Sequence, residues 1–133
     1  DVPGYGYQLA HGATALTESW QAFPYVSNNH FMLGHLMEWL YAGLAGIKQA
    51  EGSVGYNKIV IRPQPVGDIK NTAATYHSPR GDIKINWTKA DGVFDLQLSI
   101  PPNTSAEIYL PGKSKAVKTG SGHYTYSVKM KQD

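Results

Sequence analysis

One carboxylate stands alone in a long stretch near the start of the chain. Glu18 lies in the run GATALTESW (residues 12–20), and no other acidic residue occurs between Val2 and Met37. A carboxylate placed among Gly, Ala, Thr and Trp residues could accept or supply a proton in a reaction. Such chemistry also calls for a second acid, which this part of the chain does not supply. From its own residues alone, Glu18 could instead be a charge near a helix N-terminus or a solvated loop acid.

The composition limits the class of protein. The chain has 133 residues, of which 41% are hydrophobic and 17% are charged, values typical of an ordinary folded domain. Its net charge of +2 is too small to indicate nucleic acid or an anionic membrane as a partner. With zero cysteines, the chain has no disulfide, thiolate metal site or cysteine nucleophile. The start Asp1-Val2-Pro3 lacks a Met and an apolar leader, which suggests a piece of a longer protein.

A helix is expected next to Glu18, from about Asn28 to Lys48. Asn28 or Asn29 would cap its N-terminus, and Lys48 would suit its last turn. Phe31, Met32, Trp39 and Tyr41 lie off the main apolar stripe, so the helix is apolar nearly all round and needs packing partners that this chain lacks. Its stripe has the spacing of an amphipathic helix and consists of Leu33, Leu36, Met37, Leu40, Leu44 and Ile47.

The second half of the chain has the period of β-strands. Hydrophobic and polar residues alternate in short runs, and Ala90-Asp91-Gly92 is typical of a hairpin turn. We place a domain boundary near Ser53, giving residues 1–52 and 53–133. About seven strands in an antiparallel sandwich are expected at 58–62, 72–77, 82–88, 93–100, 106–110, 116–118 and 124–128.

Five segments in order resemble one known family. They are GATALTESW, NNHFMLGHLMEWLYAGLAGI, GYNKIVIRPQP, SPRGDIKINW and IPPNTSAEIYLP, and the resemblance as a whole extends from about Gly4 to Pro111. The set resembles the C-terminal end of glycoside hydrolase family 78, whose members are α-L-rhamnosidases. The resemblance implies an α+β fragment: the terminal helices of an (α/α)6 barrel followed by a C-terminal β-sandwich.

The resemblance also assigns roles to residues. The family is inverting, and its general base falls on Glu18, while the general acid falls outside this chain. A sugar-contacting histidine falls on His30, and Trp20 matches the tryptophan that follows the glutamate. Thr17 and Ser19 stand where the family often has Trp and Arg, and the stretch from Glu18 to His30 is shorter than usual.

The implied partners are a rhamnosylated glycoside or polysaccharide and the remainder of the same polypeptide, with no nucleic acid, membrane, metal or cofactor. His35 and Glu38 are spaced as a metal pair, but a third ligand is lacking and a structural hydrogen bond is favoured. The isolated fragment is expected to be inactive. The sequence leaves the compartment open, although the family is compatible with a periplasmic or secreted enzyme.

Two rival interpretations assign no catalysis to the chain. It could be a purely structural or oligomerising domain, or a carbohydrate-binding sandwich. For the second, an aromatic platform would come from Trp87, Tyr76, Tyr109, Tyr124 and Tyr126, of which at least half should be core residues because strand side chains alternate in direction.

Overall fold

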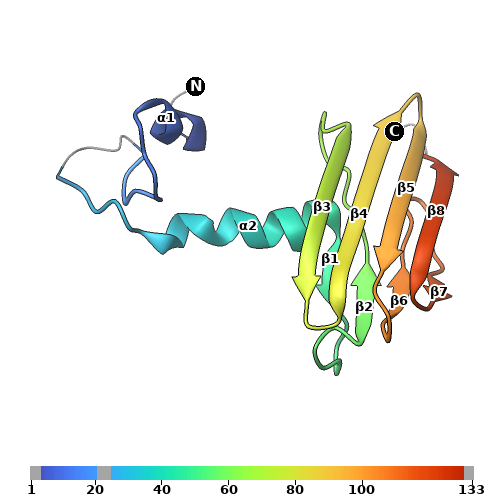
Figure 1. The fold of residues 1–133 in the computed structure, drawn as a ribbon. Helices are drawn as coiled ribbons and strands as arrows, with labels where there is room; N and C mark the ends of the chain where they lie inside the picture. The colour runs from blue at the N-terminus through green and yellow to red at the C-terminus, as the bar shows by residue number, and fades with distance from the viewer. Residues whose placement is uncertain (1–3, 21–24, 131–133) are drawn as a thin grey trace. The chain divides into compact units, whose positions relative to one another are not determined.

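The computed structural model describes residues 4–20 and 25–130. It divides into two compact units, residues 1–38 and 39–133, which are treated separately. The first unit contains helix α1 (Tyr5–Ala10), the 3-10 turn η1 (Phe31–Gly34) and most of α2 (His35–Trp39) (Figure 1). No helix in the described residues is both long and apolar enough to span a membrane.

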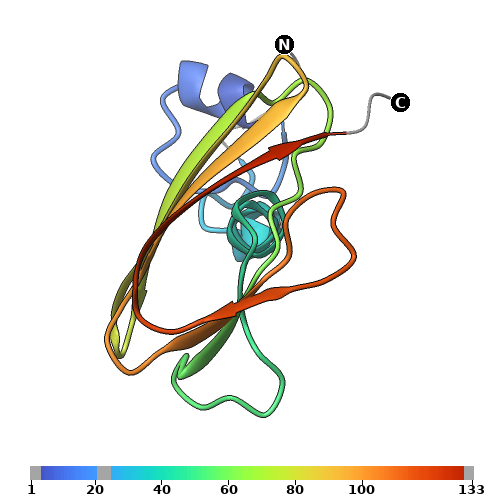
Figure 2. The same ribbon diagram turned by 90° about the vertical axis from the view of Figure 1, so that its right-hand side faces the viewer.

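The second unit is a β-sandwich that follows a π-helical segment, η2 (Leu40–Ala45). One sheet has the order β1-β2-β6-β7 and the other β3-β4-β5-β8 (Figure 2). All neighbouring strands are antiparallel except β2 and β6, which are parallel. The strands are β1 (Ile47–Gln49), β2 (Lys58–Ile61), β3 (Asn71–Ser78), β4 (Gly81–Ala90), β5 (Val93–Ile100), β6 (Ser105–Ile108), β7 (Val117–Thr119) and β8 (Gly122–Lys129).

The seven expected strands are all present, because the alternation that predicted them reflects one buried face. In β4 the buried residues are Ile83, Ile85 and Trp87, and they alternate with polar residues that face solvent. The β4–β5 hairpin turns at Asp91 and Gly92, whose φ angles are 51° and 71°. Positive φ at both central residues is what a tight hairpin turn requires.

The helix prediction is wrong at both ends. His30, not Asn28 or Asn29, occupies the N-cap position, and helical structure ends at Ala45. Gly46 then adopts φ 83°, so the chain turns out of the helix and Ile47 to Gln49 form an additional strand, β1. Lys48 therefore lies on a strand. The boundary near Ser53 stays a proposal, and the sandwich as folded already includes β1.

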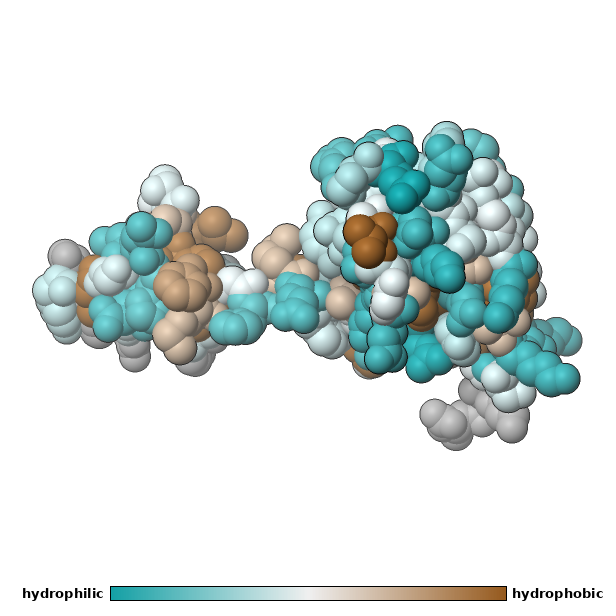
Figure 3. Space-filling model, turned by 90° about the horizontal axis from the view of Figure 1, so that it is seen from below, coloured by the Kyte–Doolittle hydropathy of each residue, from teal (hydrophilic) through white to brown (hydrophobic). Residues whose placement is uncertain are grey.

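The expected core role of the helical stripe is also only partly met. Leu44 is buried and Leu40 packs against the sandwich core. Leu36, Met37 and Trp39 are exposed, as are Phe31 at 83% and Met32 at 57%. The apolar side chains of this helical region are thus largely exposed in this chain. Figure 3 shows hydrophobic side chains interspersed with hydrophilic ones on the surface of the N-terminal unit.

Gly46 generates a stability prediction. A Cβ there would lie 2.3 Å from the backbone carbon of Arg62, whereas a Cβ on Gly112, with φ 72°, would meet nothing within 4 Å. Gly112→Ala should therefore cost only left-handed strain, about 1–2 kcal/mol. Gly46→Ala should cost on the order of 3 kcal/mol or more, because the backbone at Arg62 and Pro63, just after β2, must also move. Urea unfolding followed by tryptophan fluorescence measures both, and equal losses would contradict the prediction.

Candidate functional site

Glu18 lies where two segments of the N-terminal unit pair through their backbones. The Glu18 N–H donates to the Ser27 carbonyl at 2.8 Å, and the His30 N–H donates to the Leu16 carbonyl at 2.8 Å. These two bonds bring the neighbourhoods of Glu18 and His30 together although twelve positions separate them. The structure therefore places both predicted residues in the same short two-segment pairing.

The Glu18 carboxylate has a fixed backbone donor. The Ser27 N–H lies 3.3 Å from Glu18 Oε2, so the same residue that accepts the Glu18 N–H also donates to its side chain. The carboxylate itself is exposed in this chain. It can accept a proton from a water molecule on its open side while the Ser27 N–H limits its rotation.

Thr17 shapes the turn around Glu18, a role that the sequence analysis did not assign. Its side chain is 1% exposed, and its hydroxyl donates to the Ser19 carbonyl at 2.5 Å. This bond joins the residues on either side of Glu18 and leaves the glutamate projecting between them. The only hint in the sequence was that Thr17 and Ser19 replace the residues that the family often has there.

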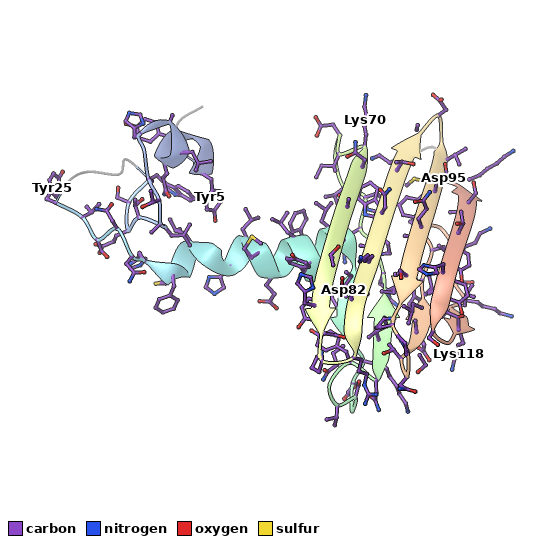
Figure 4. The ribbon with its side chains drawn as sticks, in the orientation of Figure 1. Tyr5, Tyr25, Lys70, Asp82, Asp95 and Lys118 are labelled. Carbon is purple, nitrogen blue, oxygen red and sulfur yellow. The ribbon has the colours of Figure 1, made fainter. Side chains whose placement is uncertain are left out.

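Trp20 packs against α1. Its ring meets that of Tyr5 edge to face, with centroids 5.0 Å apart. The Tyr5 hydroxyl donates to the Leu33 carbonyl in η1, so one side chain joins α1, Trp20 and the start of the helical region. Figure 4 labels Tyr5 within this unit. An edge-to-face aromatic contact holds the Trp20 ring in a defined orientation.

A hollow of about 310 Å³ lies beside the same segment. Glu18 is not among its lining residues, which are His11, Gly12, Ala13, Thr14, Ala15, Thr17 and Asn28. The hollow is therefore lined mainly by small and polar side chains, and the Glu18 carboxylate is not part of its wall.

His35 and Glu38 do not belong to a cluster. Within residues 4–20 and 25–130, three or more His, Cys, Asp or Glu side chains nowhere come close enough to hold a metal ion. His35 Nδ1 instead contacts the Met32 carbonyl one turn earlier, the structural hydrogen bond that the sequence favoured.

The aromatic residues of the sandwich do not form an exposed platform. Trp87 is fully buried, and Tyr76, Tyr124 and Tyr126 pack against the core with partly exposed rings. Tyr109 lies under the Arg62 guanidinium, 3.9 Å from its ring centroid. The expectation that at least half of these five residues belong to the core is therefore confirmed.

Comparison with known families assigns both parts of the chain. Residues 1–44 match the bacterial alpha-L-rhamnosidase 6 hairpin glycosidase domain, and residues 46–125 match the bacterial alpha-L-rhamnosidase C-terminal domain. The chain belongs to the bacterial α-L-rhamnosidase family. The resemblance drawn from the five sequence segments is thereby confirmed, as is a sandwich that follows the end of a helical domain.

Individual relatives agree with this assignment. An alpha-L-rhamnosidase of Streptomyces avermitilis is 37% identical in an alignment of 118 residues that covers 82% of this chain and 11% of that protein. One from Formosa agariphila is 30% identical over 97% of this chain and 15% of its own length. The chain thus spans only 11% and 15% of the length of these two relatives.

Solved structures of the family have the same fold. An Aspergillus terreus alpha-L-rhamnosidase matches 96% of the chain with a TM-score of 0.83 and 31% identity, over 16% of its own length. The Streptomyces avermitilis structure, complexed with L-rhamnose, matches 97% with a TM-score of 0.80 and 31% identity, over 15% of its own length.

The Tyr5 contacts generate a prediction for the N-terminal unit. Tyr5→Phe removes the hydroxyl bond to Leu33 but keeps the ring contact with Trp20, whereas Tyr5→Leu removes both. The indole N–H resonance of Trp20 in a ¹H–¹⁵N spectrum should therefore shift strongly in Tyr5→Leu and only slightly in Tyr5→Phe. Indistinguishable shifts in the two variants would show that the ring contact does not orient Trp20.

Proposed function

We propose that the protein containing this chain is an inverting α-L-rhamnosidase that hydrolyses terminal α-L-rhamnosyl linkages, and that Glu18 is its general base. The observation that carries the proposal is the carboxylate of the GATALTESW segment, pinned by the Ser27 N–H and open on its other side, within a chain of the rhamnosidase family.

In the proposed hydrolysis, Glu18 accepts the proton of the attacking water. A water proton passes to Glu18 as the water oxygen attacks the anomeric carbon from the face opposite the leaving group. The bond from that carbon to the glycosidic oxygen breaks, and a second carboxylic acid protonates the leaving oxygen. In inverting enzymes the two carboxyl groups lie roughly 6.5–9.5 Å apart, which leaves room for the water.

His30 and Trp20 would hold the rhamnosyl ring. The backbone bond from the His30 N–H to the Leu16 carbonyl supports this role, because His30 belongs to the segment that pairs with the segment of Glu18. Trp20, held by Tyr5, would supply an apolar wall for the methyl group of the deoxysugar. The sandwich would support the catalytic domain and take no part in the reaction.

The general acid and the remaining walls would come from the rest of the polypeptide. The exposed apolar side chains of Phe31, Met32, Leu36 and Met37 are the surface that its helices would cover. Burying each large side chain contributes roughly 1.5–3 kcal/mol, so packing against further barrel helices would be strongly favoured. The match of residues 1–44 to a six-hairpin domain supports this packing.

Glu18→Ala in the complete enzyme tests the base. We expect kcat to fall by roughly 10²–10⁴-fold, because no other group removes the water proton. Azide attacks without losing a proton, so it should restore turnover of an activated aryl rhamnoside and yield a glycosyl azide of inverted configuration. Glu38→Ala, which removes an exposed acid on α2, is the matched control. Full activity in Glu18→Ala would exclude the base role and favour a purely structural chain.

The 133-residue chain alone should be inactive, because the acid is elsewhere. Release of rhamnose from an aryl α-L-rhamnoside should equal the rate without protein. Clear turnover that Glu18→Ala abolishes would show that the chain contains both carboxyl groups.

A further inference from the structure

The solvent-facing side of the sheet β3-β4-β5-β8 carries a hollow of about 480 Å³. Figure 4 views this sheet, with Asp82 and Asp95 labelled toward its two ends. Lys84, Asn86, Gln97 and Ser99, from the two central strands, are among the residues that line the hollow between these ends. The proposed catalytic residues lie in the other unit, so the hollow is a separate feature of the sandwich.

Because of the strand register, the outward-facing side chains that line the hollow form two rows across the sheet. The first row is Ala73, Asn86, Gln97 and Thr125, one residue from each strand. The second row is Thr75, Lys84, Ser99 and His123. The short side chains of Ala73, Thr75 and Ser99 leave space, while amide, ammonium and imidazole groups stand beside them.

The hollow offers neutral hydrogen-bonding groups that lack partners. Asn86 and Gln97 are paired residues on β4 and β5, and both are exposed. Within the described part of the chain, their amide groups make no hydrogen bond to protein, so each presents a carbonyl acceptor and an NH₂ donor. The hydroxyls of Thr75, Ser99 and Thr125 add groups that can donate and accept. A sugar hydroxyl, which also donates and accepts, matches this set.

The charge of the face does not suit a polyanion. Lys84 Nζ lies 3.4 Å from Asp82 Oδ2, and His77 Nδ1 lies 2.7 Å from Asp82 Oδ1. The hydrogen bond from His77 lowers the pKa of Asp82, which keeps that carboxylate charged opposite Lys84. The one ammonium group lining the hollow is therefore already balanced.

The face also lacks the features of a protein-docking surface. Ile85, Leu98 and Tyr124 also line the hollow, but Ile85 and Leu98 are buried in the core and Tyr124 packs against it. Protein interfaces depend on central aromatic or large apolar anchors, and the outward-facing residues of the two rows supply none.

We propose that this face is a binding site for a neutral oligosaccharide chain, laid across the strands along the Asn86–Gln97 row. Three strand spacings of about 4.8 Å give the row a length of roughly 14 Å, enough for a few sugar residues. This role goes beyond hydrolysis, and it stands whether or not Glu18 is the base. It would hold the protein near a glycan while the catalytic domain acts.

Titration of the ¹⁵N-labelled 133-residue chain tests the site. The probes are tetrasaccharide fragments of an α-rhamnan, a β-1,4-xylan and a β-1,4-mannan, with tetragalacturonate as an anionic comparison. At least one neutral probe should shift the side-chain NH₂ resonances of Asn86 and Gln97 and saturate. Without an exposed aromatic ring to stack on a sugar, we expect a dissociation constant on the order of 1 mM.

Matched double variants separate this site from general surface effects. Asn86→Ala with Gln97→Ala should weaken binding at least tenfold. Thr88→Ala with Asp95→Ala alters the adjacent row on the same two strands, outside the lining of the hollow, and should leave binding unchanged. Glu18→Ala should also bind normally, which distinguishes failure of this proposal from failure of the catalytic one.

Three results would overturn the proposal. They are no saturable shift with any neutral probe, a response to tetragalacturonate alone, or equal losses in the two double variants. A separate labelling experiment in the complete protein compares the reaction of a thiol reagent with Gln97→Cys and with Asp95→Cys as the control. If only Asp95→Cys reacts, another part of the polypeptide occupies the face, and the proposal is overturned in that case as well.

Discussion

The sandwich depends on one buried contact between a helix end and a strand. The Trp87 indole, fully buried on β4, donates its N–H to the Leu44 carbonyl at 3.0 Å and packs on Phe94 with ring centroids 5.6 Å apart. A carbonyl in the last turn of a helix has no partner within that helix, and burying it unpaired would be costly. Trp87 supplies the partner and the hydrophobic contact together. The chain leaves the helix at Gly46, whose carbonyl accepts the Arg62 N–H at 2.8 Å, so the start of the first sheet is fixed at the same place.

The two units differ in how much apolar surface they bury by themselves. Every residue of the hydrophobic core, as far as the structure describes the chain, lies between Leu44 and Val128. The N-terminal unit leaves large apolar side chains in solvent and holds its shape mainly through backbone pairing and the Tyr5 contacts. This contrast agrees with the family assignment, because residues 1–44 correspond to a small part of a larger helical domain and residues 46–125 to a domain of their own.

The sequence predicted strands better than the helix, for a physical reason. Alternation in β4 and β5 reflects a face that is buried within this chain, so the pattern and the structure agree. The apolar residues near Trp39 form a surface that the described residues leave exposed, so the helical pattern predicted a core position that this chain does not provide. Ile47 continued the helical spacing, yet the close approach of Gly46 to Arg62 and Pro63 redirects the backbone into β1. That approach joins residues far apart in sequence and leaves no local signal.

By itself, the sequence determined the strand series, the family, and Glu18 as the one acid between Val2 and Met37, because periodicity and motif order are local properties. Only the tertiary structure decided which groups meet. It buried Trp87, which the sequence alone could equally have placed on a surface platform, and it set Thr17 beneath the turn that presents Glu18. It also aligned Ala73, Asn86, Gln97 and Thr125 in one row across the sheet. Strand register determines which residues are neighbours on adjacent strands, and it depends on pairing between segments that are distant in the sequence.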